Sequence, residues 1–260
     1  YWVYAFNTSP CGTSPVYLTA SPLNGSATTA SNVSCGSVTT LYWAGTGSSY
    51  FNGAATNNFN TATNWSTSTF FYVPSLVTPS NCTNIDIRIT SANTTINLNA
   101  NSSCYGLTML VYFGFDGFLN TNGYTLAVNN TAYVDVAAST SNNTYVGIGE
   151  STAGAAGIVD FKANFSIGTN AAGWTSNKRS YLHGTVNSKL IFRGDVLFGR
   201  TCLISGTLRP QTVEFDGIGL QEVLWNNDMY FANFQNVVVG NTNNPICRHV
   251  TGTYVPDNIF

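Results

Sequence analysis

The chain has 260 residues and a net charge of −2 at pH 7, and it is long enough to bury a large core as one all-β domain. Only 8% of the residues are charged, against about a quarter in typical soluble domains, whereas aromatic residues reach 13%. This balance argues against a nucleic-acid partner, which requires a strongly basic face, and it is typical of β structure.

The N-terminal third of the sequence carries no charge, since the first charged residue is Asp86. Its apolar residues alternate with Ser, Thr, Asn and Gly and never form the run of about 20 that a spanning helix needs, so we expect no membrane insertion. Soluble β proteins protect exposed strand edges with charge, above all with Lys. An uncharged β region therefore either covers its edges or pairs them with another chain, and we expect partner chains.

Short alternating apolar runs, each bounded by Gly or Asn clusters, predict many short strands along the rest of the chain. No segment of a dozen residues has the apolar spacing of a helix. The clearest predicted strands span residues 85–89, 95–98, 125–128, 133–136 and 237–239.

A weak repeat gives the best indication of the fold. An apolar-x-Phe pattern occurs at residues 159–161, 190–192 and 213–215, and each copy precedes a second short strand, at 165–168, 196–199 and 223–225. The last two copies are about 23 residues apart, a period typical of one coil of a parallel β-helix. We interpret Ala171–Tyr181 as an insertion that lengthens the first interval, and Leu98, Leu107, Leu119 and Leu126 as parts of earlier coils. The alternative is a β-sandwich or jelly roll.

The six cysteines form no CxxC pair and have only two histidines to supplement them, so a zinc site is poorly supported. An even number of cysteines in a chain rich in Ser, Thr and Asn suits disulfides in an oxidising compartment, and we expect a secreted, extracellular protein. The alternative is free buried thiols. The chain opens at Tyr1 without a basic segment, and we take it as mature. The sequential connectivity closes the shortest loops, and it joins Cys11 to Cys35, Cys82 to Cys104, and Cys202 to Cys247.

Two parts of the sequence resemble a known family. LYWAGTGSS from Leu41, with FNTATNWS from Phe59, resembles the opening segment of secreted β-strand-repeat surface proteins of gliding and other Gram-negative bacteria. TVEFDGIGLQEV from Thr212, with FANFQNVVV from Phe231, resembles a coil of that family. The resemblance implies a right-handed parallel β-helix of an adhesin-like surface protein.

The resemblance begins near Leu41, so we divide the chain into an N-terminal extension, residues 1–40, and a β-solenoid domain, residues 41–260. We expect Trp43 and Trp65 in the opening segment to cap the first coil rather than to stack on sugar rings.

The acidic residues are the catalytic candidates, because a glycosidase needs two carboxylates at one site and a lyase needs a base. Glu214 and Asp216 share a strand face, with Arg193 and Asp195 one coil before them, and His183 is a candidate base. Stacked charges of this kind are more often a solvated outer face. We therefore predict a non-enzymatic protein without catalytic, cofactor or metal-binding residues, and a carbohydrate-active β-helix, either lyase or binding module, is the alternative.

The two chain ends carry the functional prediction. Tyr1–Asn7 reads as a strand with bulky apolar side chains on both faces, which must be buried on both sides. Val255–Phe260 ends on apolar residues, whereas the terminal repeats of a solenoid need a polar outer face. We predict head-to-tail β-augmentation into a surface fibre for adhesion or matrix formation, with surface glycans as further partners. A fragment of a longer adhesin is another alternative. The predicted interface consists of Tyr1, Trp2, Val3, Tyr4, Ala5, Phe6, Ile259 and Phe260.

Overall fold

The chain forms two compact units, Tyr1–Ser34 and Cys35–Phe260. The computed structural model describes residues 6–7, 16–17, 35–50, 56–137, 143–169, 178–199, 202–204, 212–226, 230–232, 236–240 and 246–251. In the first unit, β1 (Phe6–Asn7) pairs antiparallel with β2 (Val16–Tyr17).

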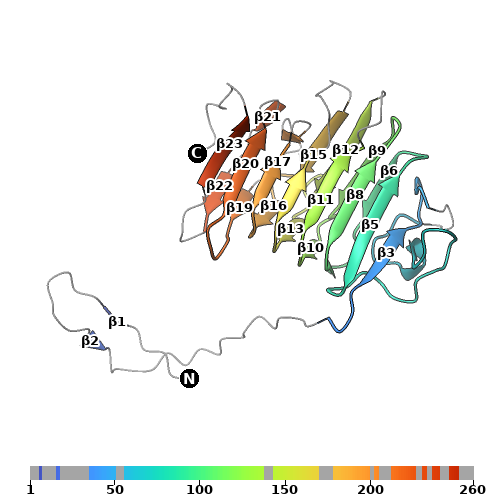
Figure 1. The fold of residues 1–260 in the computed structure, drawn as a ribbon, viewed down its shortest axis with the longest axis horizontal. Coiled ribbons are helices and arrows are strands. Elements are labelled where there is room, and N and C mark those ends of the chain that lie inside the picture. The colour runs from blue at the N-terminus through green and yellow to red at the C-terminus, as the bar shows by residue number, and fades with distance from the viewer. Residues whose placement is uncertain are drawn as a thin grey trace. The chain divides into compact units, whose positions relative to one another are not determined.

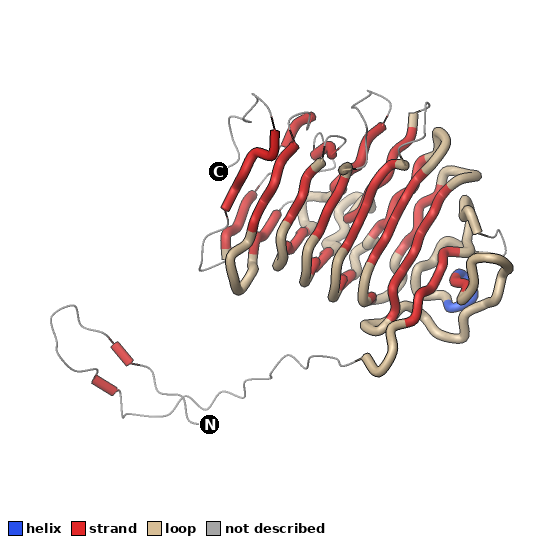
Figure 2. Tube along the Cα trace, in the orientation of Figure 1, coloured by secondary structure: helices blue, strands red, loops and turns tan. Residues whose placement is uncertain are grey.

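The second unit is all-β, as predicted, and its described residues include one short 3-10 helix, η1 (Ala62–Asn64), drawn in blue in Figure 2. Its strands form three sheets. The first sheet contains β3 (Thr39–Trp43), β4 (Trp65–Ser66), β5 (Thr83–Ile89), β8 (Leu107–Val111), β11 (Ala132–Val136), β14 (Phe165–Ile167), β17 (Val196–Phe198), β20 (Glu222–Asn226) and β23 (Ile246–Thr251). The second contains β7 (Ser102–Cys104), β10 (Thr125–Val128), β13 (Ile158–Phe161), β16 (Lys189–Phe192), β19 (Thr212–Phe215) and β22 (Asn236–Val239). The third contains β6 (Thr94–Asn97), β9 (Asp116–Asn120), β12 (Thr144–Gly149), β15 (Lys178–His183), β18 (Cys202–Ile204) and β21 (Tyr230–Ala232).

The chain enters the three sheets in rotation. From β5 to β20, each strand pairs in parallel with the strand three places later in the sequence. Among the described strands of the second unit, β3 and β4 pair antiparallel. Figure 1 shows this order in the first sheet, where the colour changes steadily from β3 to β23. A β-sandwich would instead be built from antiparallel pairs.

The repeat recognised in the sequence coincides with the strand register. Phe161 pairs with Phe192, which pairs with Phe215, at one position of β13, β16 and β19. The second strands of the repeat align in the same way, because Ile167 pairs with Phe198 on β14 and β17. All five strands predicted individually from the sequence are also present, as β5, β6, β10, β11 and β22.

The predicted insertion at Ala171–Tyr181 is partly wrong. Lys178–His183 forms β15, which pairs along its whole length with β12 in the third sheet. Residues 171–177 lie outside the described part of the chain. The alternation of apolar and polar residues is less regular in β15 than in the flanking repeats. Lys178 and Ser180 are buried at positions where an apolar residue would indicate a strand, so the strand was not predicted.

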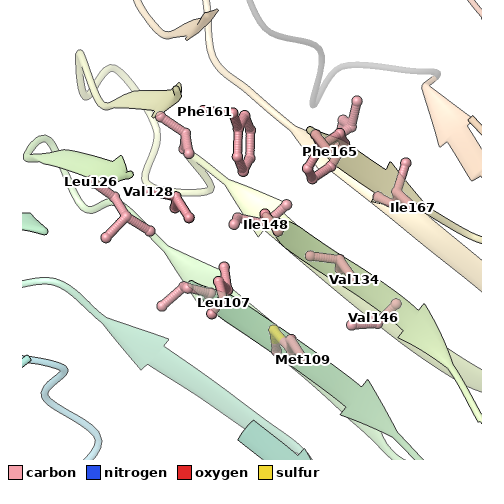
Figure 3. Packing of buried hydrophobic residues seen from close by; sticks show 14 of the residues in the cluster. Leu107, Met109, Leu126, Val128, Val134, Val146, Ile148, Phe161, Phe165 and Ile167 are labelled. Atoms are coloured by element: carbon pink, nitrogen blue, oxygen red, sulfur yellow. The ribbon is translucent and has the colours of Figure 1, made fainter. Parts of the chain in front are cut away.

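The core lies between the three sheets and consists of the side chains at alternate strand positions. Figure 3 shows Leu107 and Met109 of β8 facing the same interior as Val146 and Ile148 of β12. A row of stacked phenylalanines crosses successive strands of the second sheet, with ring centres 5.3 Å apart for Phe161 and Phe192 and 5.7 Å for Phe192 and Phe215. Identical side chains thus stack at identical positions, which explains why the repeat is visible in the sequence.

An aromatic cluster closes the β3 end of the core. Trp43 on β3 pairs with Trp65 on β4, and both side chains are fully buried with Phe59. Trp65 lies edge-on to Trp43 and to Phe59, at 5.2 Å between ring centres in each case, and its indole N–H donates to the Phe59 carbonyl at 2.7 Å. These tryptophans are therefore structural, as predicted, and no face of either ring is open to a sugar.

Candidate functional site

The described residues contain one disulfide, between Cys35 and Cys82, with a Cα separation of 5.4 Å. The predicted pairs of Cys35 with Cys11 and of Cys82 with Cys104 are therefore wrong. The parallel register of β3 with β5 sets Thr39 beside Thr83, and this brings the residues that precede the two strands together. Cys35 and Cys82 are 47 residues apart in the sequence, so this bond closes a longer loop than the predicted pairing, which was chosen to close the shortest loops.

The predicted pair of Cys202 with Cys247 is also wrong, because Cys104 and Cys202 are free buried thiols. Cys104 is the last residue of β7 in the second sheet, and its side chain points into the core. Cys202 lies on β18 in the third sheet, whereas Cys247 lies on β23 in the first sheet, so stacking does not align them. Cys11 lies outside the described residues. Burial raises the pKa of the Cys104 thiol to about 12, which keeps it protonated and unreactive.

The charged residues considered as a catalytic cleft form ion pairs on the outer face of the second sheet. Arg193 Nε lies 2.8 Å from Asp160 Oδ1, and its Nη1 bonds Asp216, so one guanidinium links three successive layers. Lys189 pairs with Glu214 in the same way. The Asp195 carboxylate accepts the backbone N–H of Glu222 at 2.8 Å. These carboxylates join neighbouring layers and do not face one another across a cleft.

His183, the candidate base, ends β15 and is almost completely buried. Its ring packs edge-on against Phe118 and Tyr181, with ring centres 4.8 Å and 5.4 Å away. Neither ring nitrogen has a hydrogen-bond partner, so His183 makes no hydrogen bond to Asp195. It therefore lacks the oriented acceptor that activates a general base. Burial lowers the pKa of His183 to about 4.

We expect His183 to make the fold sensitive to mild acid. The unfolded imidazole binds a proton below about pH 6.5, whereas the buried one stays neutral until about pH 4, so stability is lost as the pH falls through this window. Between pH 7 and pH 5 the loss from this residue is about 2 kcal/mol. Urea unfolding of wild type and His183→Phe at both pH values measures it.

The substitution of the other histidine, His249→Gln, is the matched control and should keep the acid sensitivity of the wild type. An equal change in unfolding free energy for wild type and His183→Phe would show that other groups cause the effect.

The predicted interface residues fall mostly outside the described part of the chain. Phe6 is described, and it pairs with Tyr17 within the first unit. Residues 1–5, together with Ile259 and Phe260, lie outside the described residues.

A cavity of about 310 Å³, which sequence reasoning missed, lies on the outer face of the first sheet. It lies over β3, β5, β8 and the turn before β11, and the backbone of Gly106 forms part of its lining. A Cβ on Gly106 would lie 2.7 Å from the Asn84 side-chain oxygen, so a larger residue would fill this space. The polar side chains of the lining are Thr40, Asn84, Asp86, Thr108, Asn130 and Thr131.

Most of these polar side chains have no hydrogen-bond partner among the described residues. Those of Thr40, Asn84, Thr108, Asn130 and Thr131 form no hydrogen bond with any described residue. Asp86 differs, because its carboxylate accepts from Arg88 Nε at 3.2 Å and from the Tyr50 hydroxyl at 3.1 Å. The cavity therefore presents a set of uncommitted hydroxyl and amide groups beside one neutralised carboxylate.

A row of residues in register, one from each neighbouring strand, crosses the cavity and has a tyrosine at each end. Tyr42 on β3 is in register with Asp86, Asp86 with Thr108, and Thr108 with Tyr133 on β11. Both tyrosines are half-buried on the outer face. The Tyr42 ring packs edge-on against Tyr50 at 5.1 Å, and the Tyr133 hydroxyl donates to Asp135 at 3.0 Å. An aromatic ring thus stands at each end of the polar row.

Comparisons of this chain with protein-family models, with curated proteins and with solved structures found no match. The resemblance of the opening segment to a bacterial surface-protein family stays a prediction. Within the described residues, no helix has the length and hydropathy to cross a membrane. In the same part of the chain, no group of three or more His, Cys, Asp or Glu side chains is arranged to hold a metal ion.

Proposed function

We propose that this chain is a non-enzymatic, extracellular structural subunit of the β-strand-repeat type. It is a right-handed parallel β-helix that assembles head to tail with copies of itself into a surface fibre, for adhesion or matrix formation. The observation that carries the proposal is the contrast between the two ends of the sheets: one is closed by aromatic side chains, and at the other the last described strands each pair on one edge.

The rotation of the chain through three parallel sheets supports the β-helix. Each circuit of three strands buries its inner side chains only by stacking on the circuits before and after it. Parallel strands joined by crossovers are right-handed in about 98% of known cases, which favours a right-handed coil. The Phe161, Phe192 and Phe215 stack fits this arrangement, because identical positions recur on successive coils.

The two ends of the stack support assembly. Among the described residues, β21, β22 and β23 each pair with one strand, which leaves their other edges for a further strand. On the last strand of the second sheet, Val238 and Val239 are exposed. At the other end, the loop between β4 and β5 exposes Phe70 (88%) and Leu76 (96%). Exposed apolar groups of this kind mark interaction surfaces.

The same chain therefore carries an apolar surface at each end of its sheets. No charged residue occurs between Cys35 and Ile85, so charge does not oppose contact at the β3 end. A head-to-tail contact between unlike ends does not close, and it generates a filament. The segment Tyr1–Asn7, which the sequence predicts to be a strand, is the one that we propose to add to the last strands of the next copy.

The ion pairs and the disulfide support a structural and extracellular role. Arg193 and Lys189 hold carboxylates of neighbouring layers, which suits a fibre subunit better than a catalytic cleft. The Cys35–Cys82 bond is of a kind that persists in oxidising compartments.

Deletion of Tyr1–Asn7 should leave a folded chain that no longer forms fibres. Each buried aromatic side chain of this strand contributes roughly 1.5–3 kcal/mol to a subunit contact, and the strand also supplies a ladder of backbone hydrogen bonds. Negative-stain microscopy and light scattering after gel filtration measure assembly, and circular dichroism checks the fold.

The double substitution of Val238 and Val239 by Lys tests the opposite surface and should also abolish fibres. The control is Val186→Lys, which changes an exposed valine on a turn between β15 and β16 and should assemble normally. A wild-type chain that stays monomeric and monodisperse at high concentration would rule out the fibre.

A further inference from the structure

We infer that the cavity beside Gly106 binds a neutral saccharide unit. The inference deepens the proposed adhesion role, and it rests on the proposed function only in assigning sugar binding to adhesion. Sugar binding itself is measurable whether or not the chain assembles. It follows from the chemistry of the lining, from the paired state of the strands beneath it and from the tyrosines beside it.

The lining matches a ligand rich in hydroxyl groups. Thr40, Thr108 and Thr131 offer hydroxyls that donate and accept, and Asn84 and Asn130 offer both parts of an amide. Thr131 is exposed and the other four residues are half-buried, so their polar groups can bond either water or a ligand. Five side chains around this cavity therefore have hydrogen-bonding groups available to a polyhydroxyl ligand.

The charge of the lining argues against ionic ligands. Among the described residues, the lining of the cavity contains no cationic side chain, so a phosphate, sulfate or carboxylate would meet the like charge of Asp86 and no opposite charge. That carboxylate is already neutralised by Arg88, so it does not attract a free cation strongly. A neutral ligand is the class that remains, with Asp86 available to accept a hydrogen bond from a hydroxyl.

The strands under the cavity argue against a peptide. β5 pairs with β3 on one side and β8 on the other, and β8 pairs with β5 and β11, so the backbone groups of these strands are already bonded within the sheet. A peptide has no strand edge to join here and would lose its main recognition mode. A compact ligand that binds through side chains fits better.

The size and the aromatic flanks suit a sugar. A volume of about 310 Å³ is at the lower end of the range of about 300–1,000 Å³ for small-molecule sites. Tyr42 and Tyr133 provide flat, half-buried rings at the ends of the row, on which the C–H face of a sugar ring can pack. Their contacts with Tyr50 and Asp135 hold the rings in place.

Saturation-transfer NMR of the full chain with cellobiose, maltose, lactose and N,N′-diacetylchitobiose tests the inference. We expect at least one of these probes to receive saturation, and titration of the same probe then gives a dissociation constant. The substitution Gly106→Val should raise this constant at least about tenfold, because its side chain fills the cavity.

A second variant guards against misfolding of Gly106→Val. Asn84→Ala combined with Thr131→Val keeps the glycine and removes two hydrogen-bonding groups, and it should weaken binding by about tenfold or more. The control Thr95→Val makes the same threonine-to-valine change on the outer face of β6, in another sheet, and should leave binding unchanged.

Three results would overturn the inference: no saturation of any of the four sugars, equal affinity of wild type and the double variant, or binding of a blocked Gly-Asn-Gly peptide in place of sugar. Microscopy of the same variants separates this inference from the fibre. Sugar binding without fibres would count against the proposed assembly alone, and fibres without sugar binding would count against the cavity alone.

Discussion

Replacement of Phe192 by alanine is expected to lower the free energy of unfolding by about 3–5 kcal/mol, the range for a fully buried phenylalanine. Phe192 lies in the middle of the phenylalanine stack, and its ring contacts four others. The distances between ring centres are 5.3 Å to Phe161 and Phe165, 5.7 Å to Phe215 and 6.1 Å to Phe198.

The expected loss is large because a stacked fold has little means of closing the cavity. The neighbouring layers are held at fixed spacing by backbone pairing of β13, β16 and β19, so the strands cannot move together to fill the space. Urea unfolding followed by tryptophan fluorescence measures the change. The control Phe113→Ala makes the same substitution at an exposed position and should change stability by about 0.5 kcal/mol or less. A loss below about 1 kcal/mol for Phe192→Ala would contradict the tight packing.

The phenylalanine stack also explains which part of the fold the sequence predicts well. In an array of parallel strands, the same position on successive layers has the same environment, so similar residues recur at a fixed interval. Val159, Leu190 and Val213 are an example, since they are in register and all buried. The strands and the all-β class were therefore visible from local alternation and from the repeat.

Features that depend on contacts between residues far apart in the sequence were not predictable in the same way. The partner of Cys82 is decided by the pairing of β3 with β5. These two strands are separated by a long loop, and nothing in the sequence indicates that they pair. The spacing of Cys82 and Cys104 suggested stacking, but Cys82 directly precedes β5 of the first sheet, whereas Cys104 ends β7 of the second sheet with its side chain in the core.

The cavity was invisible in the sequence for a different reason. Its lining consists of Thr and Asn, which are abundant throughout this chain, and of one glycine that resembles any turn residue. Only the register places Gly106 next to Asn84 and so reveals the missing side chain. Of the residues considered as a site in the sequence, Glu214 and Asp216 are instead engaged by Lys189 and Arg193.

Removal of the Cys35–Cys82 disulfide, by the double substitution to serine, is expected to cost about 4 kcal/mol. The bond closes a loop with a sequence separation of 47 residues, and the chain-entropy estimate for a loop of that size gives this value. The loop contains Trp43, Phe59 and Trp65, so the bond restrains the whole aromatic cluster that closes the β3 end. Thermal unfolding with and without reductant measures the effect.

The free thiols provide the internal control for this prediction. Reductant should destabilise the wild type by more than the double serine variant, because Cys104 and Cys202 form no bond that reductant can break. Burial raises the pKa of both thiols, so alkylation should reach them only after unfolding. Mass mapping of an unreduced digest should recover a peptide that joins Cys35 to Cys82. A peptide that joins Cys82 to Cys104 would contradict this assignment, because it would require the end of β7 to turn out of the core.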